Sequence, residues 1–122
     1  MANLKVIPFT DTVCLGEEDK MCAYDFRFYS IYEQEGLSKH QDGIVGLGPK
    51  QTKHGSKEGP LLINEMKKQG IIDRSLVALF VSKFASKKHS IQIGDYDESF
   101  VDGGKSNLHW FTLTIAEKGW RW

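Results

Sequence analysis

The carboxylates are the side chains of this 122-residue chain best suited to general acid–base chemistry. Two carboxylates that share one proton across a cleft can activate a water molecule for attack on a carbonyl group. The chain contains eight aspartates: Asp11, Asp19, Asp25, Asp42, Asp73, Asp95, Asp97 and Asp102. None is followed by Thr-Gly or Ser-Gly, and the closest, Asp11, has Val13 where a tight turn favours glycine. We therefore interpret the aspartates as surface and turn residues and predict no catalytic pair within this chain.

The two cysteines, Cys14 and Cys22, flank a turn-forming segment, Gly-Glu-Glu-Asp at residues 16–19. If they lie on the two arms of a hairpin, a disulfide is feasible, and the alternative is a pair of half-buried free thiols. A bridge would indicate an oxidising compartment. A zinc site with His40 and His54 is not predicted, because seven residues separate the cysteines and thirteen separate the histidines, whereas zinc ligands are usually about two to five residues apart. We predict neither a metal nor an organic cofactor.

Other chemistries lack their motifs. Gly-Lys-Ser at residues 104–106 has Ser99 where a P-loop requires its first glycine, so we interpret residues 102–106 as a glycine-rich hairpin turn. No Gly-x-Ser-x-Gly elbow accompanies the four histidines. The sixteen basic and sixteen acidic side chains cancel, which argues against nucleic acid or an anionic membrane as a partner. No apolar run approaches the roughly 20 residues of a membrane span.

Two long strands are predicted near the N-terminus. Residues 4–14 are rich in Val, Ile, Phe and Thr, with Pro8 at an edge or a bulge. In the middle of residues 21–32, apolar Tyr24, Phe26 and Phe28 alternate with polar Asp25 and Arg27, a period of two that is typical of a half-buried strand. The glycine-punctuated segment 42–49, Asp-Gly-Ile-Val-Gly-Leu-Gly-Pro, predicts a brief buried strand that another backbone approaches closely.

One helix is predicted, over residues 59–70. Pro60 fits the first helical position and Gly70 the C-terminal cap, and Leu62 and Met66 lie on one apolar face. Strand-like runs follow at residues 76–84, 90–94, 107–115 and 119–122. Seven strand candidates and one helix indicate a single, mainly β domain that spans residues 1–122.

In chain order, these segments resemble the middle of a pepsin-like (family A1) eukaryotic aspartic protease. The most specific is Gln-Asp-Gly-Ile-Val-Gly-Leu-Gly at residues 41–48, which resembles the family's Asp-Gly-Ile-hydrophobic-Gly-Leu-Gly/Ala segment. Residues 11–13 and 24–31 resemble the strands after the flap, and residues 60–70 resemble a helix that ends in Gln-Gly. Residues 73–82, 90–97, 108–110 and 120–122 resemble later strands, although Asp95 stands where the family usually has a second glycine.

The resemblance implies a partial pepsin-like acid protease β-barrel lobe with one short helix. Both catalytic Asp-Thr/Ser-Gly loops and the flap would lie outside residues 1–122. In the family, the hydrophobic-hydrophobic-Gly element packs beneath the first catalytic loop. The residues that match this support are Asp42, Gly43, Val45 and Gly46, and Ile44 matches the border of a substrate pocket. A bulkier residue at position 46 should then clash with the loop, whereas an exposed coil at this segment would count against the resemblance.

The implied function is that of a fragment of an aspartic endopeptidase, which hydrolyses polypeptides with carboxylate-activated water; this chain alone is expected to be inactive. The alternatives are a non-catalytic pepsin-like binding or assembly module and an unrelated small β interaction domain. Expected partners are the missing parts of the parent chain, or a second copy that joins through exposed strand edges. The parent is expected to be secreted or to reside in the lysosomal or vacuolar lumen. Residues 1–5 lack the apolar core of a signal peptide, so a signal would lie upstream.

Overall fold

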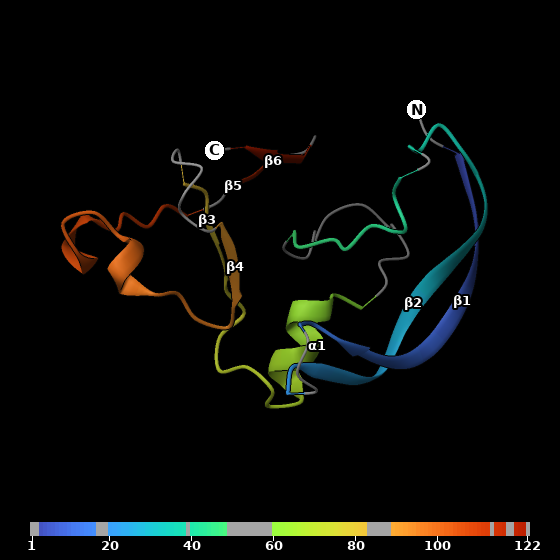
Figure 1. The fold of residues 1–122 in the computed structure, drawn as a ribbon, viewed down its shortest axis with the longest axis horizontal. Coiled ribbons are helices and arrows are strands. Elements are labelled where there is room, and N and C mark those ends of the chain that lie inside the picture. Colours follow the sequence, from blue (N-terminus) through green and yellow to red (C-terminus); the bar gives the residue numbers. More distant parts are fainter. Residues whose placement is uncertain are drawn as a thin grey trace.

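The computed structural model describes residues 3–16, 20–38, 40–48, 60–82, 89–112, 114–116 and 119–121. Within these residues the chain is mainly strand with one short α-helix, as the sequence predicts (Figure 1). The strands pair into three separate two-stranded sheets, all antiparallel. The described part of the chain therefore forms a partial β lobe whose small sheets do not close on themselves.

The first sheet is a long hairpin of β1 (Asn3–Cys14) and β2 (Cys22–Glu35). A disulfide joins Cys14 to Cys22 at the turn end of the hairpin, with an S–S distance of 2.03 Å, which confirms the predicted bridge. The ladder shifts register between Asp11 and Val13, opposite the stretch of β2 where Asp25 adopts a positive φ of 49°. Such a bulge bends a strand, and the hairpin curves toward the helix in this region (Figure 1).

Helix α1 (Leu62–Lys68) is shorter than the predicted segment 59–70. Its N-cap is Leu61, so Pro60 precedes the helix and does not occupy the first helical position, contrary to the prediction. Lys67 and Lys68 lie in the last turn, where the helix dipole favours cations.

The predicted glycine, Gly70, lies directly after the C-cap residue of α1, Gln69. Gly70 has a φ of 75° and donates its N–H to the carbonyl of Lys67 (3.0 Å), while Ile71 donates to the carbonyl of Met66 (2.9 Å). These two bonds form a Schellman motif, which satisfies carbonyl groups at the helix end. The chain is thereby redirected toward the strands that follow.

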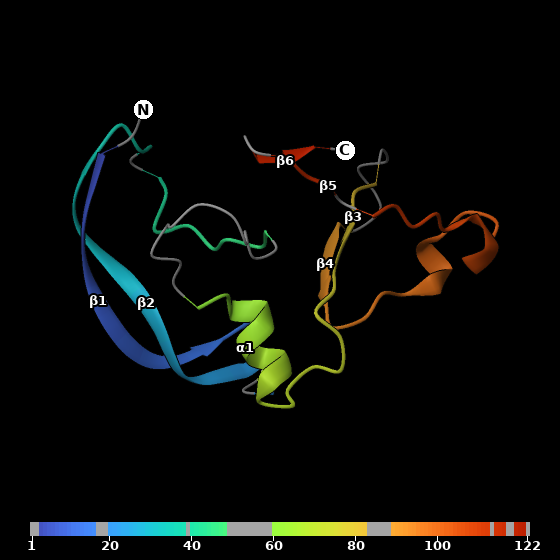
Figure 2. The same cartoon turned by 180° about the vertical axis from the view of Figure 1, so that it is seen from behind.

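The core is small and lies between α1 and the curved end of β2. Its buried members are apolar: Ala23, Phe26, Leu62, Ile63, Met66 and Ile72. Figure 2 shows α1 between the hairpin β1–β2 and the next pair of strands, so the helix is the element that joins the two halves of the chain.

Gln69 adds a polar connection to this core. Its Oε1 accepts a hydrogen bond from the backbone N–H of Tyr24 (2.9 Å), and its Nε2 donates to the backbone carbonyl of the same residue (2.8 Å). Tyr24 lies in the irregular stretch of β2 that has no register partner on β1. The side-chain amide therefore replaces the missing backbone partner and attaches the end of the helix to the hairpin.

The second sheet pairs β3 (Val77–Phe80) with β4 (Ser90–Ile93). The glycine that follows β4, Gly94, has a φ of 87° and donates its N–H to the carbonyl of Leu76 (2.8 Å). The third sheet pairs β5 (Thr114–Ala116) with β6 (Gly119–Arg121). No helix in the described chain has both the length and the apolar character that crossing a membrane requires.

Two predicted strands differ in the structure. Residues 42–48 belong to no strand, and the predicted strand at 107–115 is reduced to β5. Two short 3-10 helices, η1 (Glu98–Phe100) and η2 (Lys105–Asn107), precede it. The glycines between them, Gly103 and Gly104, have φ values of 77° and 81°. Residues 102–106 thus form a turn into η2 and do not form the predicted hairpin turn.

Candidate functional site

The segment 41–48 was predicted to hold the support for a catalytic loop and part of a substrate pocket. The structure places it in open, irregular chain in which every residue is exposed, including Asp42. Ile44 and Val45 are 68% and 59% exposed. A methyl group added at Gly43 or Gly46 would meet no atom within 4 Å. The predicted brief buried strand is therefore wrong for this chain.

The physical reason is the absence of a covering layer in the described part of the chain. A glycine-flanked pair of β-branched residues becomes a buried strand only when a neighbouring backbone covers it. No described element packs closely enough on Gly43 or Gly46 to meet an added methyl group. This geometry lends no support to the resemblance at this segment, and the roles of Asp42, Gly43, Ile44, Val45 and Gly46 stay predictions.

The two cysteines are not available as metal ligands. Cys14 and Cys22 are bonded to each other, so neither can supply a thiolate ligand. His40 is exposed and His54 lies outside the described residues. The described residues contain no group of three or more His, Cys, Asp or Glu side chains with the spacing of a metal site.

Asp97 illustrates what the carboxylates of this chain do. It caps η1 by accepting a hydrogen bond from the backbone N–H of Ser99 (2.8 Å). Hydrogen bonds from the Ser99 side chain and backbone lower the pKa of Asp97 below its ordinary value. An exposed carboxylate held ionised by a turn is a structural group, consistent with the interpretation of the aspartates as turn residues.

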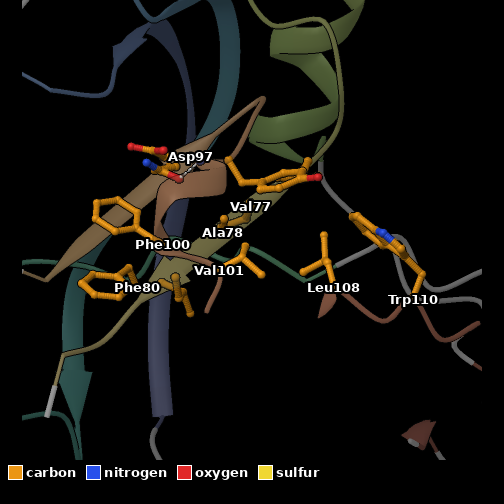
Figure 3. A pocket seen from close by; sticks show the side chains of 12 residues that line it. Val77, Ala78, Phe80, Asp97, Phe100, Val101, Leu108 and Trp110 are labelled. Atoms are coloured by element: carbon orange, nitrogen blue, oxygen red, sulfur yellow. Dashed lines mark hydrogen bonds between the residues drawn. The ribbon is translucent and has the colours of Figure 1, made fainter. Parts of the chain in front are cut away.

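A different region of the described chain, beside β3, forms an apolar hollow of about 330 Å³. Its walls come from β3, from η1 and from the chain after η2, and they include Val77, Phe80, Phe100, Leu108 and Trp110 (Figure 3). The rings of Phe80 and Phe100 stack with centroids 4.3 Å apart. Trp110 lies at the far end and is 72% exposed.

Polar contacts fix the elements around this hollow. Gln92 on β4 accepts a hydrogen bond from the backbone N–H of Asp97 (2.8 Å), which fixes the start of η1. Arg74 forms an ion pair with Asp95 and lies 5.8 Å from the centroid of the Tyr96 ring. The Tyr96 ring in turn meets Trp110 edge to face.

The hollow can bind apolar groups, but it lacks the parts of a hydrolytic centre. Among the described residues that line it, Asp97 is the one carboxylate, and it already accepts a hydrogen bond from the backbone N–H of Ser99. This hollow was not predicted from the sequence. The Asp-x-Ser pattern at residues 97–99, a capped turn that folds Phe100 back toward β3, is the signal that could have indicated it.

The geometry of the described residues does not identify the family of this chain, but comparison with known proteins does. A family model described as eukaryotic aspartyl protease matches residues 7–122, almost the whole chain. Neither the comparison with curated proteins nor the comparison with solved structures found a match. The family match is a match of amino-acid sequence over residues 7–122, so it does not depend on how residues 41–48 are packed. The chain belongs to the eukaryotic aspartyl protease family.

Proposed function

We propose that this chain is an internal piece of an aspartic endopeptidase, which hydrolyses peptide bonds with carboxylate-activated water. One observation carries the proposal: the family match covers residues 7–122, yet no aspartate in the sequence is followed by Thr-Gly or Ser-Gly. A catalytically active member of this family with no such motif within these residues would take its catalytic pair from sequence outside them. The match also removes the unrelated β interaction domain from the alternatives.

In the complete protein, two carboxylates sharing a proton would act as general acid and base on a polypeptide substrate, with no metal or organic cofactor. This chain would supply scaffold. Asp42, Gly43, Val45 and Gly46 would support the first catalytic loop, and Ile44 would border a substrate pocket.

The parent protein is proposed to be secreted or to reside in the lysosomal or vacuolar lumen. The Cys14–Cys22 bridge supports an oxidising compartment. A quantitative thiol assay of the chain isolated from its natural source, with alkylation before lysis, tests this assignment. Two free thiols per chain would contradict it.

The isolated chain is proposed to be inactive. The test incubates purified chain with a fluorogenic peptide library at acidic pH, with and without pepstatin. We expect no pepstatin-sensitive cleavage, and such cleavage by pure material would refute the proposal. The coding sequence on both sides supplies the second test, since an endopeptidase parent requires one Asp-Thr/Ser-Gly loop before residue 1 and another after residue 122.

A second candidate is a non-catalytic pepsin-like binding or assembly module. The observation that favours it is the large exposed apolar surface, which includes Ile44, Val45, Trp110 and Phe111. Flanking sequence without either Asp-Thr/Ser-Gly loop would select this candidate. Flanking sequence with both loops, together with loss of activity on an Asp→Asn change in either, would exclude it.

A further inference from the structure

We propose that the peptide between Asp42 and Gly43 is a site of spontaneous covalent modification, at which the aspartate converts to isoaspartate through a cyclic succinimide. The reaction needs an aspartate whose following backbone nitrogen is unhindered, and glycine hinders that nitrogen least because it has no Cβ. Of the eight aspartates, Asp42 and Asp102 are the two that precede glycine, and no asparagine does. The modification itself does not rest on the proposed protease function.

The chemistry uses the atoms of this dipeptide and water. The nitrogen of Gly43 attacks Cγ of the protonated Asp42 carboxyl group, an N–Cγ bond forms, and the hydroxyl group leaves as water with the proton of the amide. Water then adds to one of the two carbonyl groups of the ring and breaks the bond from that carbonyl to nitrogen. Addition at Cγ restores aspartate, whereas addition at the original backbone carbonyl leaves isoaspartate, with the main chain running through Cβ and Cγ. The net reaction changes neither mass nor oxidation state.

The backbone at Asp42 is free to reach the geometry of ring closure. Closure requires rotation about the Cα–C bond of Asp42 until the nitrogen of Gly43 meets Cγ. Both residues are exposed and belong to no helix or strand. No described residue forms a hydrogen bond with either of them, and the preceding turn ends at Gln41, whose N–H donates to the carbonyl of Ser38 (3.1 Å). A methyl group added at Gly43 would meet no atom within 4 Å, so packing does not hold this peptide plane either.

The second dipeptide, Asp102–Gly103, is equally exposed but is held by a turn. The N–H of Gly104 donates to the carbonyl of Val101 (2.9 Å), and Gly103 has a φ of 77°. The side-chain amide of Asn107 donates to the carbonyl of Asp102 (2.9 Å), which belongs to the same peptide plane as the nitrogen of Gly103. That nitrogen is the nucleophile of the reaction, so the turn must open before the ring can close. The structure therefore distinguishes two dipeptides of identical sequence.

The product would change the main chain directly before Ile44 and Val45. Isoaspartate adds a methylene group to the backbone, so the side chains that follow it are displaced as they are after a β-bulge. In the complete protein this displacement would affect the segment assigned to the support of the catalytic loop. That consequence, unlike the modification, rests on the proposed function.

The test incubates the purified, disulfide-intact chain in mildly acidic buffer and follows isoaspartate in its tryptic peptides. Chromatography separates the isomers, and methyl transfer by an isoaspartyl carboxyl methyltransferase identifies them. We expect isoaspartate to form about tenfold faster at Asp42 than at Asp102, because the turn at Asp102 must first lose two hydrogen bonds. A synthetic peptide of residues 40–50 gives the rate for a free chain, and the rate at Asp42 in the folded protein should lie within about twofold of it.

Two variants separate the chemistry from the fold. Gly43→Ala should slow the reaction at Asp42 about tenfold, because the added Cβ hinders the nitrogen, and the open space around Gly43 accommodates the methyl group. Asn107→Ala should accelerate the reaction at Asp102 several-fold and leave the rate at Asp42 unchanged, and circular dichroism checks that both variants fold. Equal rates at Asp42 and Asp102 in the wild-type chain would overturn the proposal without any variant. A rate at Asp42 tenfold or more below that of the free peptide would also overturn it.

Discussion

Replacing Gln69 by alanine should detach the end of α1 from β2. The change removes two hydrogen bonds, of 2.9 Å and 2.8 Å, that the side-chain amide makes with the backbone of Tyr24. It also removes a longer bond, of 3.3 Å, from Gln69 Nε2 to Glu65 Oε1 one turn away on the helix. Each such bond contributes about 0.5–1.5 kcal/mol net. Tyr24 is 53% exposed, so water takes over part of the freed backbone capacity. We therefore expect a loss of about 1.5 kcal/mol in the free energy of unfolding, from the lower half of the combined range for the two bonds to Tyr24.

Urea unfolding at a fixed protein concentration measures this loss. With a slope of about 2 kcal/mol per molar urea, the midpoint should fall by about 0.7 M. Gln34→Ala is the matched control, because the Gln34 amide accepts one bond from the N–H of Leu37 in an exposed local turn. Amide exchange at Tyr24 should accelerate in Gln69→Ala and stay unchanged in the control. Equal midpoints for the two variants, with Tyr24 still protected, would refute the assigned role.

Three further changes test other features of the fold. Replacing both cysteines of the Cys14–Cys22 bridge with serine opens a loop with a sequence separation of 8 residues. Thermal or urea unfolding should then show that the free energy of unfolding falls by about 2.5 kcal/mol. An unchanged free energy would contradict the proposal that the bridge stabilises the hairpin. Gly94→Ala forces alanine to a φ of 87° with its Cβ 2.8 Å from a buried isoleucine side chain, at a cost of about 2–3 kcal/mol. Gly104→Ala, with a φ of 81° and no neighbour within 4 Å, should lose less; equal costs would exclude the clash. Hydrogen bonds, chiefly from Gln69, lower the pKa of Glu65 below 4.5, so its contribution to stability is present above that pH and is lost as the pH falls through the folded-state pKa. Glu65→Gln should therefore lose less stability than the wild type between neutral and acidic pH, and parallel pH curves for the two proteins would count against the linkage.

Local patterns predicted the elements that depend on neighbours in sequence. The alternation of apolar and polar residues predicted β2, and a run rich in β-branched and aromatic residues predicted β1. The turn-forming residues between them indicated that Cys14 lies near Cys22. Gly70 marks the end of α1 because only a residue that tolerates positive φ completes the Schellman motif. In each case the required information lies within about a dozen residues.

Other features depend on partners that sequence reading does not supply. Residues 42–48 carry the composition of a buried strand, yet burial requires a second layer, and the described chain provides none. The bond pair between Gln69 and Tyr24 joins residues 45 positions apart, and no local pattern indicates it. The apolar hollow beside β3 likewise forms only after η1 folds Phe100 against Phe80. These are tertiary effects, which override local preference.

The bridge between Cys14 and Cys22 has a consequence for limited proteolysis. It converts residues 14–22 into a covalent ring, and Lys20 within that ring is a tryptic cleavage position. A single cut there leaves the two halves tethered, so the nicked chain migrates as one species on a non-reducing gel. Only a reductant separates them, so a separation by size under oxidising conditions does not remove chains nicked at this position.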